Sequence, residues 1–261
     1  TSQDGSGNAV SSGILPDTTR TSSIFVPAVS VTPTTVRNEA TQIDPRQHAV
    51  NESDAAPVLF NLMLQDLGPW DAANAHFGTI KYDQRMRNQI FDEFGFLHNE
   101  GQPSQYHNPT FEFKAPADSI LVAPISGVVT YLEWQPSTHY AQDDWEIIIA
   151  PSPHSKWGVS IDHITSIDCN RAKTGFSSCN SQLTIDGITI DIGTFIEVGQ
   201  ILGYIGNWPS DGGSGINGRT ELTVFRYFDD YSGVTNYCPI DYLDKSVRDT
   251  LKNTIHELMS S

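Results

Sequence analysis

The stretch that most constrains the fold is residues 111–134, where two short apolar runs flank a tight turn. The runs are Ile120–Ala123 and Val128–Trp134, and residues 124–127 (Pro-Ile-Ser-Gly) form the turn. β-Branched residues favour extended backbone, and Gly127 can adopt the positive φ that such a turn often needs. The stretch therefore predicts a strand, a corner and a second strand.

Similar units follow as far as about residue 228. Trp145–Ala150, Lys156–His163 and Arg219–Phe225 are predicted strands, and Asp186-Gly187 between apolar residues predicts a hairpin. Many short strands separated by glycine and proline turns are typical of a β-sandwich or a barrel. We therefore expect a mainly β fold, a β-sandwich, over residues 107–243.

The N-terminal part of the chain has a different composition. Residues 1–54 are rich in Ser, Thr, Asn, Asp and Pro, which bury little apolar surface, and they predict an extended arm or linker. Within it, Ile24–Val36 is more apolar and β-prone. This segment could pair with a sheet edge, in its own molecule or in a neighbouring copy, or it could form an extended stalk.

Helical spacing of apolar residues occurs on both sides of the expected β domain. Patterns at 58–67 and 82–94 predict that residues 55–106 form an N-terminal helical cap. At the other end, residues 244–261 predict a C-terminal helix, with an aspartate near its start and four apolar residues on one face: Val247, Leu251, Ile255 and Leu258.

The charge of the chain limits its partners. It carries 31 acidic and 15 basic residues, a net charge of −16. An acidic surface repels nucleic acids and anionic membranes, so we expect neither as a partner. The acid pairs Asp143-Asp144 and Asp229-Asp230 could bind calcium in loops, but they show no EF-hand-like spacing and are expected to be solvated surface charges. No apolar run approaches the roughly 18–20 residues of a membrane helix, so we expect no membrane span.

The three cysteines of the chain indicate the redox environment in which the protein is expected to work. Cys169 and Cys179 bracket a short polar loop and could close a disulfide in an oxidising environment, or all three cysteines could be unrelated thiols. The pairing state of Cys238 stays open. No CxxC spacing occurs, so metal binding by cysteine is not predicted. We expect a secreted or surface-exposed protein.

Several short motifs follow one another between residues 107 and 243. Ala-Pro pairs at 115–116 and 123–124 precede Gly-Val-Val at 127–129, and then come Ile161–Ile164, the glycine-containing turn Val198–Gly206, and Pro239–Leu243. In this order the motifs resemble those of the lysostaphin/LytM-type zinc endopeptidase domain, which belongs to the duplicated-hybrid-motif group of β-sandwiches.

The resemblance implies a zinc site, but the residues at its positions differ. Family members hydrolyse peptide bonds in peptidoglycan bridges with one zinc ion, whose bound water attacks the carbonyl. The positions of the family's ligands hold Asn108, Glu112 and Thr223, and those of its two catalytic histidines hold His163 and Glu221. Only Glu112 is a dependable zinc donor, and only His163 is a retained histidine.

Four residues are therefore the candidate site. His163 and Glu221 are the candidate catalytic residues, and Glu112 is a candidate metal ligand together with His107, which lies one residue from the upstream ligand position. In the alternative interpretation, Glu112 and Glu221 form hydrogen bonds across the former cleft to His163 or Arg219, and His163 is structural.

The function expected from these residues is that of a non-catalytic LytM-like domain, without a cofactor, that binds a cell-envelope glycan or peptide or a partner protein. One alternative is a zinc-dependent endopeptidase with atypical ligands, and another is a structural subunit of an extracellular assembly. A glycoside hydrolase that uses Glu112 and Glu221 as paired acids also stays open, as does stacking of sugar rings on the aromatic residues of the β region.

Overall fold

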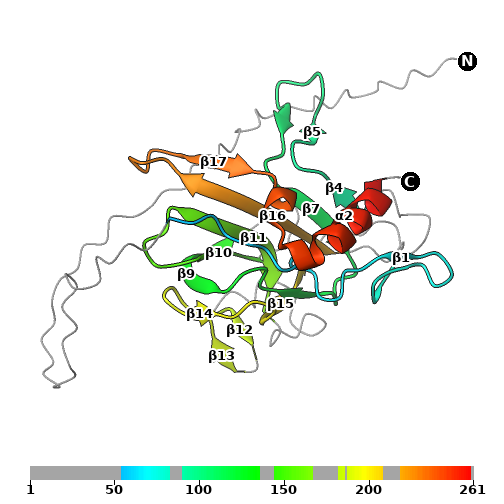
Figure 1. Ribbon diagram of the computed structural model, residues 1–261, viewed down its shortest axis with the longest axis horizontal. Coiled ribbons are helices and arrows are strands. Elements are labelled where there is room, and N and C mark those ends of the chain that lie inside the picture. Colours follow the sequence, from blue (N-terminus) through cyan, green and yellow to red (C-terminus); the bar gives the residue numbers. More distant parts are fainter. Residues whose placement is uncertain are drawn as a thin grey trace, which may run out of the picture.

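The structure, a computed structural model, describes residues 54–82, 90–135, 144–166, 182–185, 187–207 and 218–259. The segment Ile24–Val36 and the pair Cys169 and Cys179 lie outside the described residues. Cys238, which is described, is a free and half-buried thiol. The described chain forms a large antiparallel sheet with one C-terminal α-helix (Figure 1), which confirms the prediction of a mainly β fold.

Ten strands belong to the main sheet. They are β4 (Phe91–Asp92), β7 (Phe111–Ala115), β8 (Ile120–Val122), β9 (Gly127–Gln135), β10 (Asp144–Ala150), β11 (Trp157–Thr165), β14 (Phe195–Ile196), β15 (Ile201–Asn207), β16 (Gly218–Tyr227) and β17 (Val234–Tyr237).

Three small sheets and two helices complete the described structure. The small sheets comprise β1 (Trp70–Asp71), β2 (His76–Phe77) and β3 (Ile80–Lys81); β5 (Leu97–His98) and β6 (Tyr106–His107); and β12 (Thr184–Ile185) and β13 (Ile188–Thr189). The last pair confirms the hairpin predicted around Gly187. A 3₁₀ helix, η3 (Pro239–Tyr242), precedes α2 (Lys245–Met259). No described helix is long and apolar enough to cross a membrane.

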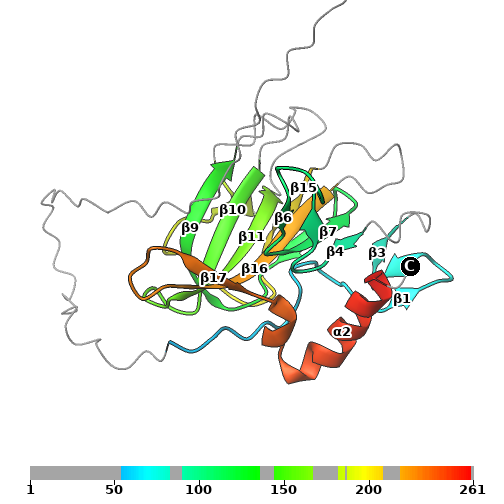
Figure 2. The ribbon, with the colours of Figure 1, turned by 90° about the horizontal axis from the view of Figure 1, so that it is seen from above.

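The order of strands in the main sheet is β14-β9-β10-β11-β15-β16-β7-β4, with β8 paired to β15 and β17 paired to β16. In addition, β11 pairs directly with β16 over six residues. Hydrogen bonds thus join the strands into one continuous sheet, not into the two separate sheets that a sandwich predicts. Figure 2 shows β9, β10, β11, β16, β7 and β4 running side by side.

The predicted corner at 124–127 is present, but Gly127 is needed for a different reason. β8 pairs with β15 and β9 pairs with β10 and β14, so the two strands diverge at the corner. Gly127 does not adopt a positive φ. A Cβ at this position would instead lie 2.2 Å from the carbonyl oxygen of Ala150. Glycine is required because β9 and β10 approach closely here.

Residues 58–67 form bends, a turn and two isolated β-bridges, so the helix predicted there is wrong. Of the helical stretch predicted at 82–94, residues 83–89 lie outside the described residues and Phe91–Asp92 form β4. The amide of Leu59 donates to the carbonyl of Tyr242 at 2.7 Å, and the amide of Val122 donates to the carbonyl of Met63 at 2.6 Å. The segment is therefore held between the end of η3 and β8. Four of its apolar side chains are buried, and their spacing resembles a helical face: Leu59, Leu62, Met63 and Leu64.

The predicted C-terminal helix is confirmed as α2. Asp244 precedes it and caps its first turn, because its Oδ1 accepts the amide of Ser246 at 2.8 Å. The inner face carries Leu251, Ile255 and Leu258, all buried in the hydrophobic core. Figures 1 and 2 place α2 beside the segment that contains β1, at the end of the sheet where β7 and β4 lie.

Leu59 links the N-terminal segment to the start of α2, because its carbonyl also accepts the amide of Asp244 at 2.8 Å. Leu59→Ala should lower the free energy of unfolding by about 2–5 kcal/mol, since its side chain is fully buried. Val58→Ala is the matched control: Val58 is 47% exposed and should change stability by less than about 0.5 kcal/mol. Urea unfolding measures both, and equal effects would contradict this packing.

Candidate functional site

A row of acidic side chains crosses the main sheet from strand to strand. Glu112 on β7 lies opposite both Asp92 on β4 and Glu221 on β16, and Glu221 lies opposite Asp162 on β11. Residues opposite each other in an antiparallel pair point to the same face of the sheet. Including the paired residues of β10 and β9, the carboxylate row consists of Asp92, Glu112, Glu221, Asp162, Glu146 and Glu133.

A β-bulge places His163 in this row. The pairs Trp145–Ile164 and Ile147–Ile161 enclose one residue on β10, Glu146, but two on β11. The extra residue interrupts the alternation of side chains along β11. His163 has a φ of +62°, a left-handed backbone that is uncommon for a residue with a side chain. Both residues of the bulge can therefore direct their side chains toward Glu146 and Glu221.

Gly206 on β15 provides the space for this histidine. A Cβ at residue 206 would lie 2.7 Å from the Cβ of His163 and 2.9 Å from Oδ2 of Asp144. The glycine at the end of the Val198–Gly206 motif thus has a steric role at the site, not only in a turn. A larger side chain would displace the histidine or its partner.

His163 is oriented by a buried carboxylate. Its Nδ1 lies 2.8 Å from Oδ2 of Asp144, which is 5% exposed, while its Nε2 lies 3.7 Å from Asp162 and 3.8 Å from Glu221. The backbone amide of His163 also donates to Oδ1 of Asp162 at 2.7 Å. Asp144 is therefore a buried partner of His163, and the expectation that it is a solvated surface acid is wrong.

Two cationic side chains lie two residues along the strands from Glu112 and Glu221. Lys114 on β7 and Arg219 on β16 lie directly opposite each other. Lys114 Nζ is 3.2 Å from Glu112 and 3.3 Å from Asp92. Arg219 Nη2 is 3.1 Å from Glu112 and also forms an ion pair with Oε1 of Glu221. Two protein cations therefore pair with the three carboxylates of the row on β4, β7 and β16.

The charges shift the pKa values of the central groups. Burial alone would raise the pKa of Glu221, but the nearby imidazole of His163, 3.8 Å away, and the charge of Arg219 lower it to about 2. Burial alone would lower the pKa of His163, but the charges of Asp162 and Asp144, the hydrogen bond to Asp144 and the nearby carboxylate of Glu221 raise it well above its ordinary value. Burial raises the pKa of Asp162 to about 7, and the charges of Glu146 and Glu221 act in the same direction.

Three of the four predicted site residues come together. Glu112, Glu221 and His163 lie in or beside the carboxylate row, whereas His107 does not meet them. His107 is exposed on the β5–β6 hairpin, and its Nδ1 lies 3.0 Å from the carbonyl oxygen of Gly95. His98 lies on the neighbouring strand β5, and one of its ring nitrogens lies within 4.8 Å of carboxylate oxygens of Asp92 and Glu112. His98, and not His107, is therefore the histidine of this hairpin that lies near Glu112.

Sequence reasoning missed Lys114, Asp92 and Asp144. Lys114 is two residues from Glu112, and Arg219 is two residues from Glu221. Side chains two residues apart on a strand point to the same face, so the sequence could have predicted that each cation lies beside a carboxylate. Asp92 and Asp144 carry no such signal, because the residues opposite them depend on strand pairing.

The residues at the family's three zinc-ligand positions do not fit zinc. Asn108 is 3% exposed, its Oδ1 accepts the hydroxyl of Thr110 at 3.0 Å, and its Nδ2, a donor without a partner among the described residues, cannot ligate a cation. Thr223 offers a neutral hydroxyl. Glu112 is engaged by two protein cations. A second set, Asp144, Asp162 and His163, has ligand atoms within 4.8 Å of one another and could hold a metal ion.

The tryptophans of the β region belong mainly to the core. Trp145 is 8% exposed and packs edge-on against Trp134, with ring centroids 5.2 Å apart. Trp157 is 9% exposed and packs against Tyr237 and Tyr242. The rings of Trp145 and Trp157 are thus packed in the core and are not available for the sugar stacking considered from the sequence, and Trp208 lies outside the described residues.

Neither the protein-family models nor the curated proteins yield a match to this chain. Among solved structures, the chain is similar to Helicobacter pylori Csd3, with a TM-score of 0.38 and 14% identity over 73% of this chain and 34% of that chain. It is also similar to a putative glycyl-glycine endopeptidase lytM from Ruminococcus gnavus, with a TM-score of 0.36 and 15% identity over 73% of this chain and 62% of that one.

The catalytic domain of the antimicrobial peptidase lysostaphin from Staphylococcus simulans gives a TM-score of 0.35 at 12% identity, over 62% of this chain and 98% of that domain. The chain thus spans about a third of Csd3 and about three fifths of the Ruminococcus protein. Likeness at this level is not evidence of a shared activity. The chemistry of the site has to be judged from its own side chains.

The role of Asp144 can be measured directly. Asp144→Asn should lower the pKa of His163, because it removes an opposite charge in contact with the imidazole. A raised histidine pKa contributes stability that is present below the ordinary value of about 6.5 and is lost as pH rises through the folded pKa. Loss of stability above that pH should therefore be smaller in the variant.

An NMR titration of the imidazole nitrogens measures this shift, and thermal unfolding from pH 6 to 9 measures its linkage to stability. Asp230→Asn, on the exposed turn after β16, is the control and should leave the titration of His163 unchanged. An unchanged titration in Asp144→Asn would contradict the assigned contact.

Proposed function

We propose that this chain is a non-catalytic LytM-like domain that binds a component of the bacterial cell envelope. The observation that carries the proposal is the position of Arg219. Its guanidinium forms ion pairs with both Glu112 and Glu221, and Lys114 holds Glu112 from the other side. The one dependable zinc donor predicted from the sequence is thus already engaged by two internal cations, and a zinc ion would have to displace them.

Electrostatics support this assignment. Arginine stays protonated at every physiological pH, so it cannot leave the site by losing a proton. Removing the partner of a buried carboxylate costs about 3–5 kcal/mol, and Glu112 is 3% exposed. The network therefore favours a stable charged floor over exchange of Arg219 for a metal. A zinc-bound hydroxide, the attacking group of the family's reaction, has no ligand set here at the family's position.

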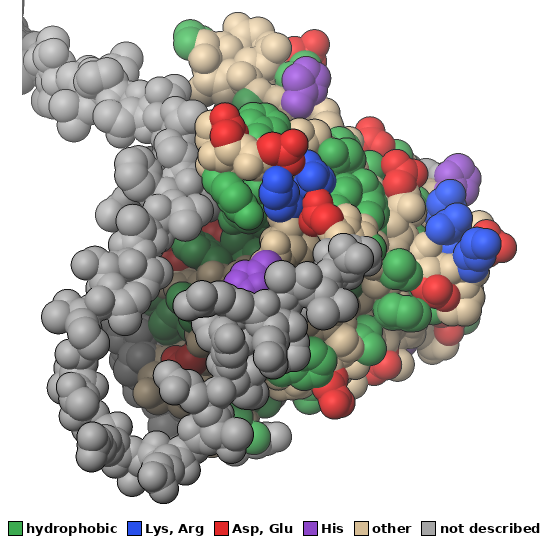
Figure 3. All heavy atoms as spheres, turned by 60° about the vertical axis from the view of Figure 1, so that its left-hand side comes forward, with side chains coloured by type: hydrophobic (Ala, Val, Ile, Leu, Met, Phe, Trp, Pro, Cys, Tyr) green, Lys and Arg blue, Asp and Glu red, His purple; other side chains and the backbone are tan. Residues whose placement is uncertain are grey.

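The surface supports an envelope ligand and not a polyanion. On the face shown in Figure 3, lysine and arginine side chains lie in two small groups, each beside acidic side chains. With a net charge of −16, the chain would repel nucleic acid. A neutral or cationic glycan or peptide fits this surface better, and a secreted or surface location fits such a ligand.

A second candidate function is a metal-dependent hydrolase whose ion is displaced along the sheet from Glu112. The group Asp144, Asp162 and His163 favours it, because an imidazole that is held at Nδ1 by a carboxylate presents Nε2 as a ligand. Glu221 would be the nearest further carboxylate. This candidate predicts cleavage where the first predicts binding alone.

Purified peptidoglycan sacculi separate the two functions. We expect the chain to co-sediment with sacculi and to release no soluble peptide or glycan fragments, whether it has been treated with a chelator or supplied with equimolar zinc. A lysostaphin-type peptidase is the positive control for cleavage. Fragment release that is lost in His163→Ala would establish the hydrolase and contradict the proposal, and failure of the wild-type chain to co-sediment would also contradict it.

A further inference from the structure

The β5–β6 hairpin, which projects from the body of the main sheet in Figure 1, carries a cluster of aromatic rings. His98 pairs with Tyr106 across the two strands, so both side chains lie on one face of the hairpin. Phe96 precedes His98 by two residues and shares that face. We call Phe96, His98 and Tyr106 the aromatic platform.

The rings of the aromatic platform are packed on one another. The ring of Tyr106 lies nearly parallel to that of His98, at 12° with 4.9 Å between centroids, and Phe96 meets His98 edge-on, also at 4.9 Å. A ring nitrogen of His98 lies within 4.8 Å of carboxylate oxygens of Asp92 and Glu112, so this ring is held close to the sheet. Tyr106 is 48% exposed and Phe96 is 41% exposed. The platform is thus supported from within and accessible to solvent.

Hydrogen bonds fix the backbone of the hairpin that carries the platform. At its base, the amide of Gly95 donates to the carbonyl of Asn108 at 2.7 Å. At its tip, the amide of Gln102 donates to the carbonyl of Asn99, and the amide of Gln105 donates to the carbonyl of Gln102, each at 3.0 Å. A ligand that binds here therefore has little loop to order, which lowers the free-energy cost of association.

The tip of the hairpin supplies neutral hydrogen-bonding groups beside the platform. Six of the seven residues 99–105 are uncharged, and the exposed ones include amide side chains. Nδ2 of Asn99 donates to the carbonyl of Ser104 at 3.3 Å, and Oε1 of Gln105 accepts the amide of Gly101 at 2.8 Å. No described residue pairs with Oδ1 of Asn99 or Nε2 of Gln105. These atoms provide an acceptor and a donor for a ligand.

This combination fits a neutral sugar ring whose substituents are equatorial. The axial C–H groups of such a ring form a flat apolar face, which the electron-rich face of an aromatic ring attracts. Hydroxyl groups at the rim of the sugar can donate to Oδ1 of Asn99 and accept from Nε2 of Gln105. An apolar protein surface would leave these amide atoms without partners. An anionic sugar would be repelled by the net charge of −16.

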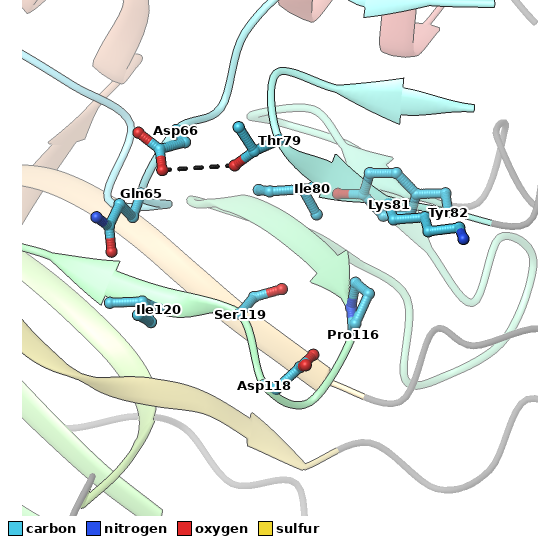
Figure 4. A pocket seen from close by; sticks show the side chains of 10 residues that line it. All are labelled: Gln65, Asp66, Thr79, Ile80, Lys81, Tyr82, Pro116, Asp118, Ser119 and Ile120. Carbon is cyan, nitrogen blue, oxygen red and sulfur yellow. Dashed lines mark hydrogen bonds between the residues drawn. The ribbon is translucent and has the colours of Figure 1, made fainter. Parts of the chain in front are cut away.

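The pocket between the segment 65–82 and the turn 116–120 does not offer such a face, although its volume is about 670 Å³ (Figure 4). Its lining includes one aromatic side chain, Tyr82, which is only 4% exposed. The exposed residues of the lining are Asp66, Thr79, Lys81 and Asp118. A sugar ring could not stack on this surface, so the hairpin is the better site.

We propose that the aromatic platform binds a neutral, β-1,4-linked glycan, with one sugar ring stacked on Tyr106 in continuation of the His98–Tyr106 stack. The inference rests on the proposed function and deepens it, because it names a site and a chemical class for the envelope ligand. A projecting hairpin suits a long polymer, which can contact it without entering a pocket. The glycan contact is thereby placed on the β5–β6 hairpin and not on the carboxylate row.

Saturation-transfer NMR with the full chain tests the proposal. The probes are cellotetraose and the β-1,4-linked tetramer of N-acetylglucosamine, which are neutral and differ in one ring substituent. We expect transfer to at least one probe, strongest at the axial protons of one face of a ring. Tyr106→Leu keeps an apolar cover over His98 but has no flat ring, so it should weaken binding about tenfold, whereas Tyr106→Phe should bind within about threefold of the wild type.

Thermal unfolding separates loss of binding from loss of fold. Both variants of Tyr106 should melt close to the wild type, since they change a half-exposed side chain. Tyr231→Leu is the matched control: this tyrosine is 55% exposed on the turn after β16, and its loss should leave binding unchanged. Transfer to neither probe, or equal binding by Tyr106→Leu, would overturn the platform assignment alone. Cleavage of sacculi by the wild type would overturn the proposed function whatever the NMR shows.

Discussion

The ion pairs between Arg219 and the two carboxylates on either side of it determine the character of this sheet. Strand pairing brings Glu112 and Glu221 directly opposite each other on one face, and like charges in that position repel. Arg219, two residues along β16, places its guanidinium where it reaches both. Without this cation the central part of the carboxylate row would be unstable as a set of ionised groups. With it, the same row becomes a charged floor that carries its own counter-ions.

Local features of the backbone position the side chains in the other half of the carboxylate row. The bulge on β11 gives His163 its place beside Glu221, and the absence of a side chain at Gly206 leaves room for the His163–Asp144 contact. His163 balances part of the charge of Asp144, Asp162 and Glu221, where neither Lys114 nor Arg219 pairs with the two aspartates. Among the described residues, one of the two groups of three possible metal ligands lies here, Asp144, Asp162 and His163, and the other is Asp92, His98 and Glu112. The two halves of the row thus differ: the carboxylates of one pair with Lys114 and Arg219, and those of the other lie around His163, which titrates.

Much of the fold could be predicted from local sequence, because strands and turns leave local signals. The apolar runs at Ile120–Ala123 and Val128–Trp134, the hairpin at Gly187 and the face of α2 follow from periodicity and turn chemistry. Residues 58–67 could not be assigned in this way, because their spacing results from burial between two distant neighbours, Tyr242 and Val122. For the site, residue types at motif positions led to Glu112, His163 and Glu221. Asp144, Asp92 and the bulge depend on which strands pair, so only the structure shows them.

The proposed function requires that a guanidinium, and not a metal, lies between Glu112 and Glu221. Anomalous X-ray scattering at the zinc edge, from crystals of the full chain equilibrated with excess zinc, tests this most directly. We predict no anomalous peak within bonding distance of Glu112 and Arg219 in contact with both carboxylates. A zinc peak ligated by Glu112, with the side chain of Arg219 turned away, would contradict the account.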